Sequence, residues 1–315
     1  MSYADKVFKE ICETIINDGS TTEGQKVRPI WPDTGESAYT IKTFGVSNIY
    51  DLRKEFPALT FRKTALKSAF DEILWIYQKK SNNIRDLNSS VWDEWADESG
   101  SIGRAYGYQV GQCSHFMDVV GRTDMSDEFK REYPSTRQVI SRIDHLGPTL
   151  NIYMDQMDIL LYELKNNPFS RRLKINLWNP TDLKYMALQP CCYDLTFNVT
   201  DEGGDKLVLN LALNQRSQDM LAANNWNTAQ YALLLMAVAQ VVDMVPGKLM
   251  HTITDAHIYD RHVPIIKELI QRPMYDAPIV KLDPSIKNFY DFTKESVIVE
   301  NYIAGPQVND IPIAV

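Results

Sequence analysis

The chain has 315 residues, 44% of them hydrophobic, and a formal net charge of −8 from 41 acidic and 33 basic residues. A chain of this length and hydrophobicity can bury one large core or two modest ones. Its charges of both signs are scattered without a long basic block, which disfavours bulk nucleic-acid binding but allows a local anion site built from a few arginines.

The first part of the chain predicts two helices and one extended segment. Apolar residues recur at helical spacing over residues 3–17. Residues 18–37 are polar with several glycines and prolines, which is typical of a loop, and residues 38–50 favour an extended conformation. A second helix is predicted after Thr64, with apolar side chains along one side and Glu72 inside that apolar stripe.

Residues 110–152 differ from the segments around them, because they carry many charges together with glycine, proline and serine. We interpret them as an insertion that is partly helical around residues 125–145. A helix over residues 154–165 follows and ends at Asn166-Asn167-Pro168.

The second half of the chain alternates strands with helices. Strands are predicted over residues 173–178, 193–200, 206–213 and 248–258, and helices over residues 228–243 and 261–271, before a mostly extended tail. The alternation has no regular βαβ rhythm. We therefore predict an α+β fold, with one domain over residues 1–315 and a mixed sheet packed with helices.

The cysteines and the N-terminus bear on the compartment. Of the four cysteines, Cys191 and Cys192 are neighbours, which is a poor basis for a disulfide framework. The N-terminus lacks a basic region followed by an apolar signal core. We expect a reduced, cytoplasmic protein. No histidine or cysteine spacing is typical of a zinc site, so we expect no metal.

Cys191 is a candidate nucleophile, since Pro190-Cys191-Cys192-Tyr193 stands directly before a predicted strand. A free cysteine is more often a small buried hydrophobe, and it becomes reactive where a positive neighbour lowers the pKa of its thiol. The chain offers Arg216 and the adjacent pair Arg171 and Arg172. Two neighbouring arginines are usually solvated, but they can also clamp a phosphate.

Other candidates also have two interpretations. Glu72 is either a carboxylate at the helix surface or a partly buried acid whose pKa is raised by desolvation, which suits proton transfer. Trp92, Trp95 and Trp226 are core residues or apolar walls of a ligand site. Asn227 is a turn residue or an amide that reads a pyrimidine edge with one donor and one acceptor.

Taken in order, several segments closely resemble the thymidylate synthase family. They are Asp71-Glu72-Ile73-Leu74-Trp75-Ile76, Val91-Trp92-Asp93-Glu94-Trp95, Ala105-Tyr106-Gly107-Tyr108-Gln109, Ser170-Arg171-Arg172 with Trp178-Asn179-Pro180, Met186-Ala187-Leu188-Gln189-Pro190-Cys191, Gln215-Arg216-Ser217-Gln218-Asp219-Met220 through Asn227, Asp255-Ala256-His257-Ile258-Tyr259 and Pro312-Ile313-Ala314-Val315. Each alone is weak, but their shared order leaves chance a negligible explanation. The resemblance covers nearly the whole chain, broken mainly by residues 110–152, and implies a homodimer joined through a sheet face.

The resemblance implies reductive methylation of dUMP to dTMP, with 5,10-methylenetetrahydrofolate as one-carbon and hydride donor. Cys191 would attack carbon six of the uracil ring and make carbon five nucleophilic. Glu72 would relay protons, Tyr106 would assist at carbon five, and Arg216 would hold the phosphate and favour the thiolate. The implied catalytic set is Cys191, Glu72, Tyr106, Asn227 and Arg216.

The same resemblance implies the two ligand sites. For dUMP the residues are Arg28, Arg171, Arg172, Gln215, Arg216, Ser217, Asp219, Asn227, His257 and Tyr259, with the paired arginines contributed by the neighbouring subunit and the last two residues at the deoxyribose hydroxyl. For folate they are Arg62, Trp92, Trp95, Asp219, Trp226, Ala314 and Val315. Asp219 would bind the pterin, Arg62 the glutamate tail, and the C-terminus would close the site.

This sequence departs from the family pattern at several positions. Cys192 stands where most relatives have histidine, Val110 replaces a tryptophan, and residues 222–226 replace the usual Leu-Gly-x-Pro-Phe before Asn227. Three other functions remain as alternatives. A hydroxymethylase is disfavoured by Asn227, where a deoxycytidylate hydroxymethylase has aspartate, and by Trp92. RNA binding as the main role is disfavoured by the negative charge. An inactive paralogue is disfavoured by the retained set of site residues.

Overall fold

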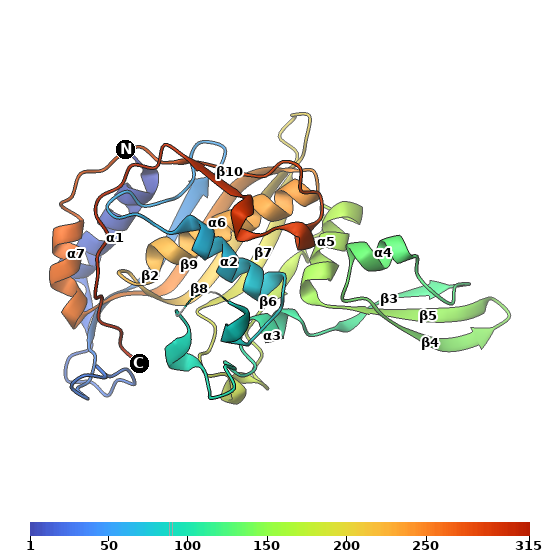
Figure 1. The fold of residues 1–315 in the computed structure, drawn as a ribbon, viewed down its shortest axis with the longest axis horizontal. Coiled ribbons are helices and arrows are strands. Elements are labelled where there is room, and N and C mark those ends of the chain that lie inside the picture. The colour runs from blue at the N-terminus through green and yellow to red at the C-terminus, as the bar shows by residue number, and fades with distance from the viewer. Residues whose placement is uncertain (88, 90) are drawn as a thin grey trace.

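A computed structural model describes residues 1–87, 89 and 91–315, and its centre is a six-stranded sheet in the order β1-β2-β9-β8-β7-β6 (Figure 1). The strands are β1 (Ser20–Thr21), β2 (Thr40–Asp51), β6 (Lys174–Asn176), β7 (Cys192–Thr200), β8 (Val208–Asp219) and β9 (Val245–Tyr259). Strands β8 and β9 are parallel and the other neighbouring pairs are antiparallel. The prediction of a mixed sheet with helices is confirmed.

Helices pack against this sheet and against one another. The α-helices are α1 (Tyr3–Asp18), α2 (Leu66–Tyr77), α3 (Gly107–Val110), α4 (Asp127–Glu132), α5 (Gln156–Asn166), α6 (Asn224–Val241) and α7 (Val263–Leu269). Helix α6 is apolar on all sides from Tyr231 to Ala239 and lies between the β8–β9 pair and α2, so it is buried almost throughout. Among the described residues no helix is long and apolar enough to cross a membrane.

Short 3-10 helices complete the helical content. They are η1 (Ile84–Asp86), η2 (Asp93–Trp95), η3 (Leu183–Tyr185), η4 (Asp260–His262), η5 (Phe289–Asp291) and η6 (Lys294–Ser296). The predicted helix over residues 261–271 is thus η4 followed by the shorter α7. The predicted helix over residues 228–243 begins earlier, at Asn224, and the strand predicted over 206–213 continues to Asp219. The other predicted helices and strands of the main body are confirmed within a few residues.

Residues 110–152 form a separate sheet, in the order β3-β5-β4, that projects away from the main body at the right of Figure 1. Its strands are β3 (Ser114–Val120), β4 (Arg137–Asp144) and β5 (Gly147–Met154), and β4 and β5 form a hairpin. The prediction of partial helix around residues 125–145 is confirmed by α4, whereas β4 in the same range is a strand that the sequence interpretation did not predict.

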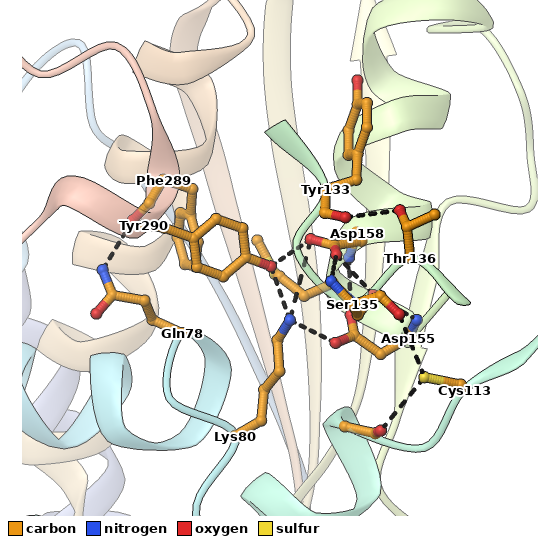
Figure 2. Close-up of polar contacts among 12 residues, drawn as sticks. Gln78, Lys80, Cys113, Tyr133, Ser135, Thr136, Asp155, Asp158, Phe289 and Tyr290 are labelled. Atoms are coloured by element: carbon orange, nitrogen blue, oxygen red, sulfur yellow. Dashed lines mark hydrogen bonds and ion pairs between the residues drawn. The ribbon is translucent and has the colours of Figure 1, made fainter. Parts of the chain in front are cut away.

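Buried charges tie the base of this projection to the main body, as Figure 2 shows. The Lys80 ammonium follows α2 and contacts the carboxylate of Asp155, lies 3.9 Å from Asp158 Oδ1 and donates to Tyr290 Oη over 2.7 Å. Asp155 and Asp158 stand at the start of α5 and have exposed fractions of 1% and 0%. Ser135, from the projection itself, donates to Asp158 Oδ2. The cluster therefore joins four segments of the chain, at residues 80, 135, 155–158 and 290.

The C-terminal part of the chain crosses the body and ends beside the N-terminal loop. It forms the hairpin of β10 (Ile279–Leu282) and β11 (Val297–Glu300) and then runs extended. At its end, Val315 and Ile30 exchange two backbone hydrogen bonds of 3.1 and 2.8 Å. Figure 1 shows this end of the chain close to the loop that precedes β2.

Candidate active site

Cys191 and Arg216 meet at the ends of neighbouring strands. Cys191 directly precedes β7, and the antiparallel pairing of β7 with β8 places Arg216 beside it. The backbone N–H of Arg216 donates to Cys191 O over 2.9 Å, and Arg216 Nη2 lies 3.7 Å from Cys191 Sγ. The guanidinium also donates to the backbone oxygens of Gln189 and Pro190, which fixes its orientation. The predicted nucleophile and its positive neighbour are therefore in contact.

The environment of Cys191 contains opposing effects on its thiol. Burial raises the pKa of Cys191, whereas the charges of Arg216 and Arg28 oppose that rise. Tyr106 Oη accepts a hydrogen bond from Cys191 N over 3.2 Å, so the phenol also lies at the thiol. At rest the thiol is protonated, and the positive charge stands where a thiolate would form.

Cys192 lies on the opposite face of the strand, because consecutive side chains of a strand alternate. Its side chain is buried, and burial raises the pKa of its thiol well above the usual range. It packs toward Tyr231, whose hydroxyl lies 3.1 Å from that of Tyr77. Cys192 is therefore a core residue, whereas Cys191 is half-buried.

Glu72 is an acid buried among N–H donors. Burial raises the pKa of Glu72, and the indole N–H of Trp226 donates to Oε2 over 3.0 Å. The side-chain N–H groups of Gln230 and Trp92 also face this carboxyl and limit the rise. In the part of the chain that the structure describes, neither of these two N–H groups makes a hydrogen bond of good geometry. They remain available to a bound molecule or water.

Aromatic rings surround this carboxyl. Trp92 packs edge-on against Tyr106 and Trp95 and tilted against Trp75, with ring centroids 4.9, 5.8 and 5.8 Å apart. Such a low-dielectric surrounding is the cause of the raised pKa.

Asn227 is half-buried and belongs to a chain of hydrogen-bonded side-chain amides. Its Nδ2 donates to Gln230 Oε1 over 3.1 Å, and its Oδ1 accepts from Gln215 Nε2 over 3.1 Å. Gln215 Oε1 in turn lies 2.8 Å from His251 Nε2. Burial lowers the pKa of His251 to about 4, so the ring is neutral and its one N–H donates to Gln215. The chain fixes the orientation of the Asn227 amide, which keeps one N–H and one lone pair free.

Asp219 ends β8 and accepts hydrogen bonds from the backbone N–H groups of Leu221 and Ala222, over 2.8 and 3.1 Å. Burial raises the pKa of Asp219, but His262, His257 and the backbone N–H of Ala222 together outweigh this effect, so the net pKa is lowered. Asp219 is therefore ionised. The distance from its Oδ1 to His262 Nδ1 is 3.4 Å.

His257 and Tyr259 lie together at the end of β9, with ring centroids 5.3 Å apart. His257 Nδ1 is 3.0 Å from Asp255 Oδ1, whose other oxygen accepts from Lys42 Nζ over 2.6 Å. Asp255 thus holds the imidazole by one nitrogen and leaves Nε2 for other contacts. Burial raises the pKa of Tyr259 to about 12, so its hydroxyl is protonated.

Three of the predicted arginines lie apart from Cys191 in this chain. Arg171 and Arg172 are exposed in the loop after α5. Arg62 is buried and donates to the backbone oxygen of Leu221 and to Asn225 Oδ1, while its Nε has no partner among the described residues. Burial lowers the pKa of Arg62.

The sequence interpretation missed four buried polar residues that orient the predicted ones: Gln218, Gln230, His251 and His262. The only signal in the sequence was a polar residue at an inward position of an apolar strand or helix. Within the described ranges, no group of three or more histidine, cysteine, aspartate or glutamate residues could hold a metal ion.

Comparison with known proteins gives one consistent result. The family model described as thymidylate synthase matches residues 6–315. The chain is 34% identical over 311 residues to thymidylate synthase 1 of Bacillus subtilis strain 168, and 36% identical over 311 residues to a thymidylate synthase of Bacillus licheniformis, with 98% of each chain covered in both cases. The solved structure of thermostable thymidylate synthase A from Bacillus subtilis superposes with a TM-score of 0.80 at 35% identity, covering 99% of both chains.

Proposed function

The chain belongs to the thymidylate synthase family, and we propose that it acts through a covalent adduct of dUMP on Cys191. It is a methyltransferase that converts dUMP to dTMP with 5,10-methylenetetrahydrofolate as co-substrate, releasing dihydrofolate. The observation that carries the assignment of the nucleophile is the 3.7 Å approach of Arg216 Nη2 to Cys191 Sγ.

In this proposal Cys191 Sγ bonds to carbon six of uracil, and the π electrons of the ring double bond make carbon five nucleophilic. The folate supplies the methylene carbon and then the hydride. Arg216 stabilises the thiolate as the thiol proton leaves, and the Tyr106 hydroxyl assists proton removal from carbon five. The contact of Cys191 N with Tyr106 Oη supports placing both groups at one ring.

Glu72 relays protons between the base and water in the same proposal. A buried carboxyl with a raised pKa can both give and take a proton near neutral pH. The unpartnered N–H groups of Trp92 and Gln230 beside it support a bound water or ligand atom at this point.

Asn227 reads the uracil edge. Uracil offers an N–H and a carbonyl there, and the fixed amide has one lone pair and one N–H left to meet them. Cytosine offers the opposite pattern at its amino group and ring nitrogen. The orientation imposed through Gln215 therefore supports dUMP as substrate, in preference to dCMP.

The phosphate and ribose of dUMP complete the proposed site. Arg28, Gln215, Arg216 and Ser217 would lie at the nucleotide from the same chain, with His257 and Tyr259 at the deoxyribose hydroxyl. Arg171 and Arg172 would reach it from the second subunit of a homodimer, because they are exposed and apart from Cys191 in their own chain.

The proposed homodimer is joined through the sheet. Ile49 on β2 and Met250 on β9 are large apolar side chains with exposed fractions of 51% and 38%, and they pair directly, so they share one face of the sheet. Large apolar side chains on one strand pair favour burial against a partner. We also propose that residues 1–315 are one domain with an insertion at about 110–152, acting in the cytoplasm, with RNA binding only secondary.

The proposed folate site comprises Arg62, Trp92, Trp95, Asp219, Trp226, Ala314 and Val315. Asp219 is ionised and can accept from the pterin, and the tryptophans offer apolar walls. The free Nε of Arg62 supports its contact with a carboxylate of the glutamate tail.

The test is turnover by the purified protein with dUMP and methylenetetrahydrofolate, followed by the absorbance of dihydrofolate, with products identified by mass spectrometry. We expect dTMP from the wild type, neither dTMP nor an adduct from Cys191→Ser, and retained turnover in the matched Cys192→Ser. Turnover by Cys191→Ser would contradict the assignment. A hydroxymethyl nucleotide as product would identify a hydroxymethylase instead.

A further inference from the structure

Tyr106 stands in a strained turn at the start of α3. Its backbone has φ 46° and ψ −105°, a combination that residues other than glycine rarely adopt. Such a conformation persists only where the surrounding structure holds it. The hold matters for the proposed reaction, because Tyr106 Oη accepts a hydrogen bond from Cys191 N over 3.2 Å.

The side chain of Gln109 folds back across this turn. Gln109 lies three residues after Tyr106 and is 3% exposed. Its Nε2 donates to Arg104 O over 2.9 Å and to Asp182 Oδ2 over 2.8 Å, and its Oε1 accepts from Asn179 Nδ2 over 3.3 Å. Both N–H groups of the amide are therefore used. A flipped amide would place Oε1 against two acceptor oxygens, so the partners fix this orientation.

Asp182 belongs to the segment that leads to Cys191, and it is 7% exposed. Arg104 Nη1 donates to its Oδ1 over 2.7 Å, and Asn179 Nδ2 donates to its Oδ2 over 3.1 Å. Hydrogen bonds from Gln109 and Arg104 lower the pKa of Asp182, so the group is a carboxylate. It accepts from the residues on both sides of the strained turn at once.

The backbones of the two segments also pair with each other. The backbone N–H of Arg104 donates to Tyr185 O over 2.9 Å. This pairing brings the segments together before the turn, and the contact of Gln109 with Asp182 continues the connection past Tyr106. The turn is therefore held from both of its ends.

We propose that Gln109 and Asp182 are positioning residues that hold the Tyr106 hydroxyl beside Cys191. Gln109 binds Arg104 O before the turn with its side chain, and its own backbone N–H donates to Tyr106 O over 2.9 Å. Without this closure the turn can relax from its strained conformation, and the hydroxyl moves. The inference rests on the proposed role of Tyr106 in proton removal from carbon five.

Two variants and one control separate this role from general stability. Gln109→Met keeps the length of the side chain and removes its three hydrogen bonds. Asp182→Asn keeps the shape of the carboxylate but turns an N–H group toward another donor, so it is the smaller change. The matched control is Gln112→Met, because Gln112 is exposed and its side chain donates, among the described residues, only to Tyr108 O.

The first measurement is turnover beside dUMP binding. A misplacement of about 1 Å costs about 10² in rate, so we expect Gln109→Met to lower kcat about 10–100-fold and Asp182→Asn about tenfold. The Kd for dUMP should stay within about threefold of the wild type, because the contacts of Arg216 and Asn227 are unchanged. Gln112→Met should retain the kcat of the wild type.

The second measurement is the amount of covalent adduct on Cys191. Proton removal from carbon five follows the attachment of the folate methylene carbon, so a misplaced hydroxyl should leave the bridged adduct in place. After mixing with dUMP and methylenetetrahydrofolate, denatured Gln109→Met should carry more of this adduct than the wild type, as measured by mass spectrometry. A loss of folded enzyme would instead lower the adduct and the turnover together.

The deciding comparison is a double-mutant cycle with Tyr106→Phe. This variant should lower kcat by about 10² or more, as expected for a positioned proton-transfer group. If Gln109 acts through the hydroxyl, Gln109→Met should lower kcat by less than about threefold in the Tyr106→Phe background. The same factor in both backgrounds overturns the inference, and so does a Gln109→Met protein with the kcat of the wild type.

The cycle also separates this inference from the proposed function. Equal factors in both backgrounds, with a low kcat for Tyr106→Phe, leave the role of Tyr106 standing and remove only the positioning by Gln109. A Tyr106→Phe protein with the kcat of the wild type removes the role of Tyr106 and this inference with it. If Gln109→Met does not fold, the same cycle with Asp182→Asn decides between these outcomes.

Discussion

Replacing Lys80 by methionine removes the only cation in contact with two buried carboxylates in the described part of the chain. Lys80 contacts the Asp155 carboxylate, lies 3.9 Å from Asp158 and donates to Tyr290 (Figure 2). Methionine keeps the length and most of the apolar volume of the lysine stem. The variant therefore isolates the loss of the charge from the loss of packing.

The expected cost follows from burial. Removing one partner of a buried ion pair typically costs about 3–5 kcal/mol, because the remaining charge is left unpaired. Asp155 and Asp158 are 1% and 0% exposed, so water cannot replace the ammonium. At this chain length each kcal/mol corresponds to about 2 °C in Tm, which gives a decrease of about 6–10 °C at pH 7.

The loss of stability caused by Lys80→Met should be smaller at acidic pH. Burial already raises the pKa of Asp155, and the charge of Lys80 opposes that rise, so removing Lys80 raises the pKa of this carboxyl further. A carboxyl with a raised folded-state pKa takes up a proton on folding as pH falls, and the neutral form needs no cation. The difference in Tm between Lys80→Met and the wild type should therefore be smaller at pH 5 than at pH 7.

The assay is thermal unfolding followed by circular dichroism at both pH values. The matched control is Lys79→Met, because Lys79 is exposed and its ammonium donates, among the described residues, only to the backbone oxygen of Asp86. We expect the control to lie within about 0.5 kcal/mol of the wild type. A Lys80→Met protein within 2 °C of the wild type at pH 7, or one that loses more at pH 5, would refute the reasoning.

Three further predictions concern the site and one turn. Glu72→Gln should lower kcat by about 10²–10⁴ and remove the acidic limb of the kcat/KM profile, as measured by dihydrofolate absorbance from pH 4.5 to 9. Asn227→Asp should lower kcat/KM for dUMP by about 10² or more and raise kcat/KM for dCMP, since a carboxylate has no N–H for the uracil carbonyl. Equal losses of kcat/KM on both nucleotides would contradict the proposal that Asn227 recognises the uracil edge. Gly103→Ala should lower the free energy of unfolding in urea by at least about 2 kcal/mol, because Gly103 has φ +72° and a Cβ there would stand 2.1 Å from Tyr185 O. The control Gly121→Ala should lower it by about 1 kcal/mol, because Gly121 has φ +79° but open space at the Cβ position.

The helices of the main body could be predicted because their amphipathic periodicity is local. Helix α2 shows its apolar stripe in the sequence, and α6 is apolar enough that only a buried helix fits it. The projecting sheet could not be predicted in the same way. Its pairing shifts register between His115 and Met117 and between Ile140 and Arg142, which interrupts the alternation that marks a strand.

In the candidate site, too, the sequence predicted the residues of local motifs but not the residues whose partners are distant in the chain. Motifs identified Cys191 and Arg216, and their contact follows from two adjacent strands. The residues that orient the site were missed because their partners are remote. His262 bonds an oxygen 50 residues further along the chain, and His251 meets Gln215 across 36 residues. A single sequence carries no signal for such pairs beyond a polar residue in an apolar segment.

The buried cluster at Lys80 also affects the proposed reaction at Cys191, because it supports the turn that carries Tyr106. Lys80 and Tyr106 are both non-glycine residues with positive φ, 54° and 46°. Non-glycine residues keep this strained backbone conformation where contacts with the surrounding structure hold them in it. Gly107 provides that contact, since a Cβ there would stand 2.1 Å from Ser81 O, so the turn that carries Tyr106 lies directly on the segment after Lys80. Because Tyr106 Oη accepts from Cys191 N, a shift of this turn would move the phenol at the thiol. Lys80→Met should therefore lower kcat as well as Tm, although Lys80 touches neither Cys191 nor Glu72 in any contact described for this chain.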